Sequence, residues 1–331
     1  MLKANAGVIK FYDISQWQEK PHFQTGGTRD KVIVENPEDG NLYYFKTSLK
    51  RANDEYKHEF WSEIIASDIG RELGFNTLHY DVVINKNKIG CLSKSMVDAN
   101  RNKLSEIINY LRGYDSNYNP NDKSSYCKYT FRFIEQALRS YNMEGEMRHI
   151  VTTIIFDSLI GNGDRHQENW GFIIPNSHGG NGEEHTELVV NAVKCVFAPI
   201  YDSGSCLGRE LLDEKIEKML GDDQMLYAYI NRDRCEIRWD SAKKISHFDL
   251  IEQIMEQPNY RQTVEDEIAR IERVFNAEKI AKIINGIDQH LPENLTQYGL
   301  PGNRKQLIKK IVSLRFDKLT ELKCKDCKTY T

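Results

Sequence analysis

The chain lacks the features that mark membrane, secreted and nucleic-acid-binding proteins. None of its apolar runs reaches the roughly 18 residues that a membrane helix needs, and acidic residues interrupt the N-terminal segment before a signal sequence could form. Its 45 lysines and arginines nearly balance 49 aspartates and glutamates, so no strong overall field attracts nucleic acid or anionic lipid. We therefore expect a cytoplasmic protein with no membrane or nucleic-acid partner, although secretion without a cleaved signal would leave no trace in this pattern.

Cysteine is also scarce and irregularly placed. Seven cysteines, an odd number without regular spacing, do not form a disulfide framework and favour a reducing compartment. Cys324 and Cys327 supply only two of the four ligands of a structural zinc site, so free thiols are the simpler interpretation. His178 and His185 flank a glycine-rich segment that is more typical of a hairpin tip than of a metal site.

What the sequence does contain changes in character near residue 100. Before that point, the pattern predicts two β-rich hairpins, at residues 31–48 and 77–96, and one helix between them at residues 58–75. Beyond it, helical spacing dominates, interrupted by short apolar strands; helices are predicted at 104–114, 129–141, 146–160, 264–284 and 305–322. The pattern predicts an α+β protein of two lobes, a small β-rich lobe at 1–97 and a larger helical lobe at 98–331.

Two residue groups in the smaller lobe suit the binding of a nucleotide. Gly26 and Gly27 lie between predicted strands, where adjacent glycines allow backbone N–H groups to approach phosphate oxygens, and Thr25 and Thr28 add hydroxyl donors. Taken alone, such a pair is more typical of an ordinary turn. Lys46 sits inside an aromatic strand, from which it either extends to water or faces a cleft and binds phosphate.

A phosphate-binding lysine needs a carboxylate partner, and the following helix offers two. Glu63 lies off the apolar stripe of that helix, on a side lined by small residues, which makes it the better partner for Lys46. Glu59, one turn earlier, is the reserve candidate. A solvated helix face explains either glutamate when it is considered alone.

The larger lobe carries a polar loop, GNGDRHQENWGF, directly after a predicted helix. Asp164 and Asn169 supply a carboxylate for an attacking hydroxyl and an oxygen ligand for magnesium, while Arg165 and His166 can orient the loop. The alternative is an Asx-turn formed by Asn162 with a hydrogen-bonded buried histidine.

A second acidic position follows in PIYDSGS, where Asp202 ends an apolar strand. This placement suits a further magnesium ligand, although Tyr-Asp-Ser-Gly alone is a common turn. The order of all these segments favours phosphoryl transfer from a nucleotide.

Together, these segments resemble the HipA-like serine/threonine kinase family in its short, stand-alone, CtkA-like type, over about residues 23–208. The Asp-Arg-His-x-x-Asn string is shared with phosphatidylinositol-kinase-like enzymes. The resemblance implies a two-lobed kinase-like fold that uses ATP and Mg²⁺, with Asp164 as the catalytic aspartate and Asn169 and Asp202 as metal ligands. It also implies Lys46 as the ATP lysine and Glu63 as its ion-pair partner.

The resemblance carries further implications for ligands and partners. Met96 and Val97 would lie at the hinge that contacts adenine, Gly26, Gly27 and Thr28 would contact the phosphates, and Thr25 or Thr28 would be a site of autophosphorylation. The substrate would be a protein serine or threonine, and an antitoxin-like or regulatory partner is implied. Only about two dozen residues precede the glycine loop, fewer than the extra N-terminal subdomain of full-length HipA toxins needs. A lipid or small-molecule kinase and a nucleotide-binding pseudokinase are the alternatives.

Overall fold

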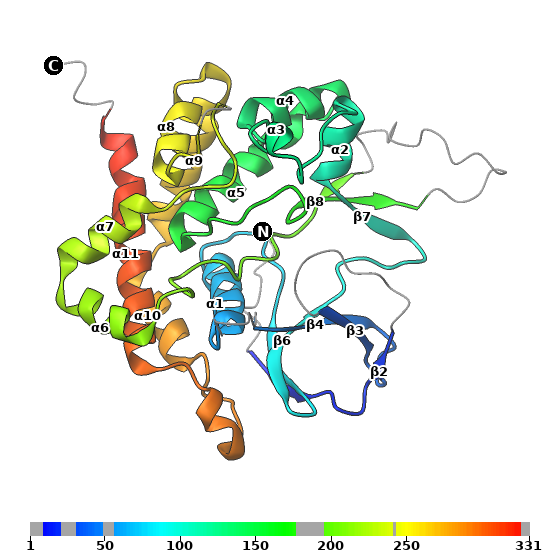
Figure 1. Cartoon of the computed structure of the whole chain (residues 1–331), viewed down its shortest axis with the longest axis vertical. Coiled ribbons are helices and arrows are strands. Elements are labelled where there is room, and N and C mark those ends of the chain that lie inside the picture. The colour runs from blue at the N-terminus through cyan, green and yellow to red at the C-terminus, as the bar shows by residue number, and fades with distance from the viewer. Residues whose placement is uncertain (1–8, 21–30, 49–55, 177–194, 241–242, 326–331) are drawn as a thin grey trace.

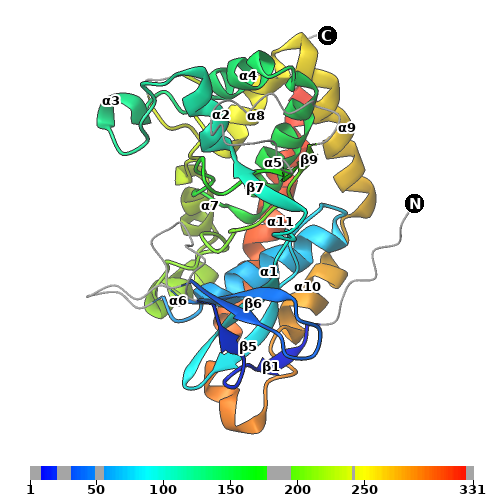
Figure 2. The same ribbon diagram turned by 90° about the vertical axis from the view of Figure 1, so that its right-hand side faces the viewer.

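The computed structural model describes residues 9–20, 31–48, 56–176, 195–240 and 243–325. It is an α+β protein with a curled sheet in its N-terminal half and a helical C-terminal part (Figure 1). This confirms the predicted fold class. The turned view shows the sheet toward one end, α2 (Ile107–Tyr114) and α4 (Phe131–Ser140) toward the other, and α1 (Glu59–Glu72) between them (Figure 2). The exact division at residue 97 stays a prediction.

The N-terminal sheet has six strands in the order β1-β5-β6-β4-β3-β2. Their bounds are β1 (Phe11–Asp13), β2 (Gln18–Glu19), β3 (Lys31–Glu35), β4 (Leu42–Thr47), β5 (Asp81–Asn85) and β6 (Lys88–Lys94). Both predicted hairpins are present as the antiparallel pairs β3–β4 and β5–β6. The two hairpins join through β4 and β6, which places the C-terminal end of β4 in the middle of the sheet.

Helix α1 is buried on nearly every side because it lies between the sheet and the C-terminal part. Trp61, Ile65 and Ile69 form the predicted apolar stripe and are fully buried. The helix contacts both β6 and α10 (Ala277–Gly286). It ends before Gly74, whose positive φ of 81° is a conformation that favours glycine.

The C-terminal part contains the remaining helices and a small sheet of order β7-β8-β9. The other helices are α2 (Ile107–Tyr114), α3 (Lys123–Tyr126), α4 (Phe131–Ser140), α5 (Met147–Ile160), α6 (Asp213–Gly221), α7 (Asp223–Arg232), α8 (His247–Met255), α9 (Pro258–Val274) and α11 (Gly302–Lys325). The strands are β7 (Asn102–Glu106), β8 (Gly171–Pro175) and β9 (Val196–Phe197).

The helix predicted at 104–114 was wrong at its start. Residues 102–106 form strand β7, which pairs with β8, and the helix begins only at Ile107. Leu104, Ile107 and Ile108 fit a helical period, but the ladder with β8 supplies hydrogen bonds that a local pattern does not show.

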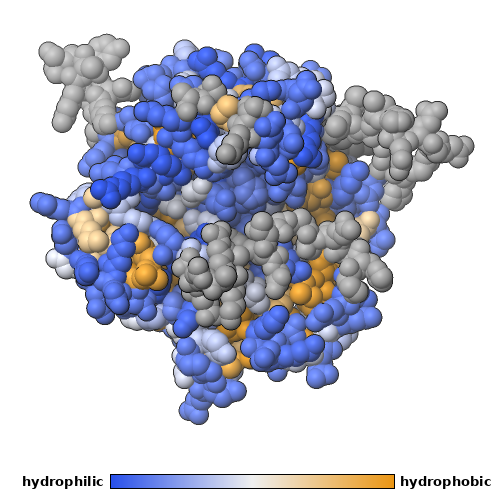
Figure 3. All heavy atoms as spheres, in the orientation of Figure 1, coloured by the Kyte–Doolittle hydropathy of each residue, from blue (hydrophilic) through white to orange (hydrophobic). Residues whose placement is uncertain are grey.

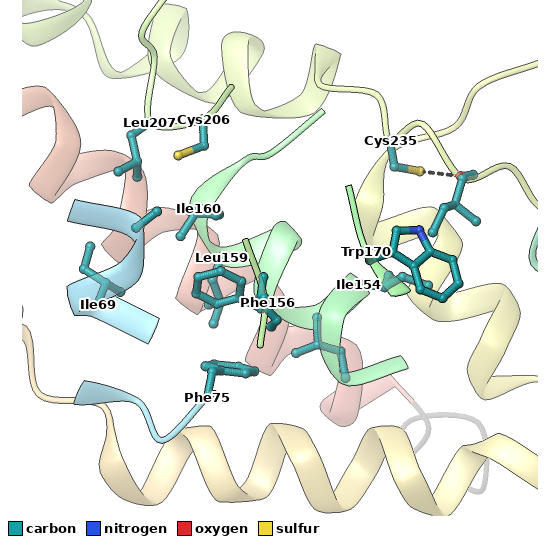
Figure 4. Packing of buried hydrophobic residues seen from close by; sticks show 14 of the residues in the cluster. Ile69, Phe75, Ile154, Phe156, Leu159, Ile160, Trp170, Cys206, Leu207 and Cys235 are labelled. Carbon is teal, nitrogen blue, oxygen red and sulfur yellow. Dashed lines mark hydrogen bonds between the residues drawn. The ribbon is translucent and has the colours of Figure 1, made fainter. Parts of the chain in front are cut away.

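Helix α5 forms the centre of the main hydrophobic core. Figure 4 shows Phe156, Leu159 and Ile160 of α5 packed near Ile69 and Phe75 on one side and Leu207 on another. The rings of Phe75 and Phe156 lie 4.9 Å apart between their centroids. Because this core includes residues from both halves, packing fixes the position of α1 relative to the loop that follows α5.

The described surface is mainly polar. The face in Figure 3 is largely hydrophilic, with small separate apolar areas. Among the helices of the described ranges, none combines the length and the apolar character needed to cross a bilayer.

Candidate active site

Lys46 forms two ion pairs, one with helix α1 and one with the C-terminal part. Its Nζ lies 3.3 Å from Glu63 Oε2 and 2.7 Å from Asp202 Oδ1. Lys46, Glu63 and Asp202 come from β4, α1 and the segment after β9, and all three are buried. A buried lysine between two carboxylates is a site where charge is balanced within the protein.

The neighbouring strand adds a second cation, which the sequence reasoning missed. Lys31 on β3 is the register partner of Lys46, so both side chains leave the same face of the sheet. Lys31 Nζ lies 3.3 Å from Asp202 Oδ2, so the two lysines contact different oxygens of one carboxylate. The predicted hairpin already implied this pairing, and counting its register would have identified Lys31.

Backbone geometry presents the Asp202 carboxylate to these lysines. Asp202 has a φ of 55°, in the left-handed region that non-glycine residues seldom occupy. The N–H of Ser203 donates to Glu63 Oε1 at 3.0 Å, and the Asp202 N–H donates to the Tyr80 hydroxyl at 3.4 Å. Burial, with Glu63 and Asp202 nearby, holds the Tyr80 pKa well above its ordinary value, so the hydroxyl stays neutral. Local backbone strain of this kind persists where surrounding contacts impose it, which is frequent at functional sites.

The polar loop begins where α5 ends. Gly161, with a φ of 69°, is the left-handed cap of α5. Asp164 follows, and its Oδ2 accepts a hydrogen bond from Ser205 Oγ at 3.1 Å. Asn169 Nδ2 donates to the Asp164 carbonyl oxygen at 2.8 Å, which ties the two ends of the loop together. The Asx-turn alternative is also present, because the Asp164 N–H donates to Asn162 Oδ1 at 3.3 Å.

Arg165 holds this loop against the Asp202 segment. Its guanidinium is buried and donates to both oxygens of Asp157 at 2.8 Å. It also donates to the carbonyls of Asn169 and Tyr201, at 2.9 and 2.6 Å, and to Ser203 Oγ at 3.0 Å. Burial alone lowers the Arg165 pKa, but the adjacent Asp157 carboxylate raises it above the ordinary value. Arg165 is therefore a fixed cation that orients the loop.

The remaining predicted residues lie at the edges of this arrangement. His166 is half-buried, and its Nδ1 accepts from the Glu168 N–H at 3.3 Å. Met96 and Val97 lie between β6 and β7, where the chain passes from one sheet to the other. Glu59, the reserve partner, forms an ion pair with Arg209.

The predicted glycine loop cannot be placed in this arrangement. Gly26 and Gly27, together with Thr25 and Thr28, lie outside the described residues, as do His178 and His185.

The side chains around Lys46 include possible ligands for magnesium and for the phosphates of ATP. Within the described ranges, no three His, Cys, Asp or Glu side chains form a group that could hold a metal ion by themselves. Magnesium does not need such a cage, because it keeps water ligands and binds one or two protein oxygens together with phosphate. Asp202 and Asn169 fit that pattern, and Lys46 and Lys31 fit the charge of a phosphate chain.

Comparison with known proteins agrees with this geometry. No family model matches the chain. It is 34% identical over 100 residues to the serine/threonine-protein kinase CtkA of Helicobacter pylori, a match that covers 30% of this chain and 26% of that protein. The crystal structure of the H. pylori proinflammatory kinase CtkA matches with a TM-score of 0.72 and 21% identity over 94% of this chain and 95% of the other. The chain has the HipA-like kinase fold of the CtkA type.

This confirms the family resemblance predicted from the sequence. A second HipA-like structure, HipA of Shewanella oneidensis MR-1 in complex with HipB and operator DNA, matches with a TM-score of 0.50 and 13% identity. That match covers 92% of this chain and 66% of the HipA chain. The sequence match to the curated CtkA spans about a quarter of that protein's length.

Proposed function

We propose that the protein is an ATP- and magnesium-dependent serine/threonine protein kinase of the HipA-like, CtkA type. The observation that carries this proposal is the contact of Lys46 with Glu63 and Asp202 at the junction of the two halves. It supports a nucleotide site, because a lysine paired with a helix carboxylate beside a metal-binding aspartate is the arrangement that phosphoryl transfer needs. The likeness to a named serine/threonine kinase supports a protein acceptor.

Each predicted residue has a defined part in this proposal. Lys46 and Lys31 would bind phosphate oxygens, and Glu63 would hold Lys46 in place. Met96 and Val97 would contact the adenine, while Gly26, Gly27 and Thr28 would approach the phosphates from the glycine loop. Asp202 and Asn169 would hold magnesium, which when bound neutralises charge on the transferred phosphoryl group.

The proton chemistry belongs to the loop after α5. Asp164 would accept the proton of the attacking serine or threonine hydroxyl as its oxygen bonds to the γ-phosphorus of ATP, while the bond from that phosphorus to the bridging β-phosphate oxygen breaks and ADP leaves. The hydrogen bond from Ser205 fixes one carboxylate oxygen of Asp164. Arg165 and His166 would keep the loop in the conformation that presents this carboxylate.

Incubation with radiolabelled ATP and magnesium tests the proposal directly. We expect label on the protein itself or on added proteins with the wild type, and none with Asp164→Asn or Asp202→Ala. Label on lipid vesicles alone would favour the lipid kinase alternative. Nucleotide binding without label on any acceptor would favour the pseudokinase alternative.

Two finer expectations belong to the same proposal. Mass spectrometry after ATP incubation should find phosphate on Thr25 or Thr28, and its absence would remove autophosphorylation from the proposal. The scarce and irregularly spaced cysteines of the sequence support a reducing, cytoplasmic location. An antitoxin-like or regulatory partner stays a prediction from the family resemblance.

A further inference from the structure

Residues far along the chain hold the loop that carries Asp164 from behind. Arg315 of α11 donates to the Ser158 carbonyl oxygen at 2.9 Å. His247, the first residue of α8, places its Nε2 2.9 Å from the carbonyl oxygen of Asn162. These contacts lie one on each side of Gly161, where α5 ends and the loop begins. The loop is therefore held by two elements of the C-terminal part.

The ring of His247 is enclosed between two acceptors. On its other side, Nδ1 lies 2.9 Å from Asp233 Oδ2, and only 2% of the side chain is exposed. A carbonyl oxygen and a carboxylate oxygen both accept hydrogen bonds and cannot donate them. The Nε2 contact is a hydrogen bond in which the ring donates to the Asn162 carbonyl oxygen, whereas the Nδ1 contact lies at ion-pair distance without hydrogen-bond geometry.

Asp233 is held as a carboxylate in this surrounding. Its Oδ2 also accepts from Arg315 at 2.6 Å, so a guanidinium and an imidazole ring lie against one oxygen. Burial alone raises the Asp233 pKa, but His247 and Arg315 lower it well below the ordinary range. The acceptor that faces His247 Nδ1 is thus a charged one.

The contact continues from His247 to Asp164 through a single residue. Asn162 is fully buried, and its Oδ1 accepts from the Asp164 N–H at 3.3 Å. Its Nδ2 donates to Asp157 Oδ1 at 3.0 Å, on the same carboxylate that binds Arg165. A shift of the Asn162 backbone would therefore move both Asp164 and the Asp157–Arg165 pair.

Close packing leaves this loop little freedom to adjust. A Cβ on Gly161 would lie 2.8 Å from the Arg315 guanidinium, and one on Gly163 would lie 3.0 Å from the Arg234 carbonyl oxygen. The backbone of the loop thus lies directly against the group that includes Asp233 and Arg315. Because the packing is close, a movement of Asp233 or Arg315 would displace the loop backbone.

We propose that His247 is a positioning residue for phosphoryl transfer, a ring whose Nε2 fixes the Asn162 carbonyl and, through it, the backbone of Asp164. This inference rests on the proposed function, because it gives Asp164 its role. His247 itself is buried behind the loop, so it acts through Asn162 and not on the substrate.

Nitrogen NMR of the full chain with ¹⁵N-labelled histidine tests the protonation directly, with His247→Asn used to assign the signal. We expect Nε2 of His247 to show the protonated signature in the wild type, because it donates to the Asn162 carbonyl oxygen. An Nε2 without a proton in the wild type would overturn the inference. This readout does not depend on any enzymatic activity.

Kinetics then separate positioning from a purely structural role. In His247→Asn, we expect the rate of phosphoryl transfer at saturating ATP to fall by about 10- to 100-fold, the order expected for a small misplacement. The Kd for ATP should stay within about twofold, because Lys46 and Lys31 are untouched. His290→Asn, at an exposed histidine after α10, is the matched control and should leave both values unchanged.

The possible outcomes distinguish this inference from the proposed function. An unchanged rate in His247→Asn, or a rate and an ATP affinity that fall together with the melting temperature, would overturn the positioning role. If His247→Asn does not fold, Asp233→Asn carries the same kinetic comparison. A wild type that transfers no phosphate would refute the proposed function and the catalytic purpose of the positioning, while the NMR result would still decide the protonation of the ring.

Discussion

The side-chain nitrogen of Lys46 lies 2.7 Å from Oδ1 of Asp202, a residue 156 positions further along the chain. Lys31 contacts the other oxygen of the same carboxylate, and Glu63 contacts Lys46. Two lysines and two carboxylates therefore form one group in which positive and negative charges balance. In the proposed kinase, a bound nucleotide and its metal would therefore replace some of these ion pairs with contacts of their own.

Removing Lys46 should unbalance that group. We expect Lys46→Met to lower the free energy of unfolding by about 3 kcal/mol, because Glu63 and Asp202 would lose a buried partner. It should also abolish most ATP binding and lower phosphoryl transfer by about 100-fold or more. Urea denaturation and calorimetric titration with ATP measure the two effects. Lys88→Met, at an exposed lysine of the same sheet, is the control; equal losses in both variants would contradict the prediction.

Arg165 should not be replaceable by lysine. The guanidinium donates five hydrogen bonds, to Asp157, two backbone carbonyls and Ser203. A lysine has one nitrogen and cannot reproduce this fork. We expect Arg165→Lys to lower the free energy of unfolding by about 2 to 4 kcal/mol, through unsatisfied buried acceptors. Arg139→Lys, at an exposed arginine of α4, should change it by less than about 0.5 kcal/mol. Similar values for both variants in urea denaturation would show that the Arg165 network adds no stability.

The sequence predicted secondary structure correctly in segments where the spacing of apolar residues alone determines it. The stripe of Trp61, Ile65 and Ile69 defined α1, and its orientation pointed Glu63 toward Lys46, which lies 3.3 Å away in the structure. Strand β7 was missed because Leu104 also fits a helical period, and only its pairing with β8 selects a strand. A pattern shows which face of an element is buried but not which element covers it.

The same limit explains which parts of the site were missed. His247 reaches Asn162 across 85 positions, and Arg315 reaches Ser158 across 157. Contacts of this length depend on how α8 and α11 pack around α5, which no short motif records. Lys31 could have been predicted, because the register of the hairpin pairs it with Lys46.

The contribution of Asp233 to the free energy of unfolding should decrease as the pH falls. Burial opposes its charge, but His247 and Arg315 lower its pKa in the folded protein below the ordinary value of 3.8. Its contribution is therefore complete above the unfolded pKa and is lost as the pH falls toward the folded one. We expect the difference in unfolding free energy between wild type and Asp233→Asn to be about 3 kcal/mol at pH 5, above the unfolded pKa of the aspartate.

Below about pH 4, that difference should shrink by at most about 1.4 kcal/mol per pH unit, because the unfolded wild type takes up a proton that the folded one does not. Urea denaturation at several pH values measures it. Asp317→Asn, at an exposed aspartate of α11, should show a difference within about 0.5 kcal/mol at every pH. A difference for Asp233→Asn that grows on acidification would contradict the sign of the effect.

Gly90 should be required for the placement of Lys46. It lies in β6 opposite Thr47, and a Cβ there would collide with the Lys46 carbonyl oxygen and lie 2.9 Å from the Phe45 ring. Gly90→Ala must therefore push β4 away from β6, at a cost of about 2 kcal/mol or more in unfolding free energy. Because Lys46 moves with β4, the Kd for ATP should rise as well, whereas Gly145→Ala, where a Cβ meets nothing within 4 Å, should leave both unchanged. If Gly90→Ala lowered stability without weakening ATP binding, the position of Lys46 on β4 would not determine nucleotide affinity, and the proposed role of the lysine would have to be abandoned.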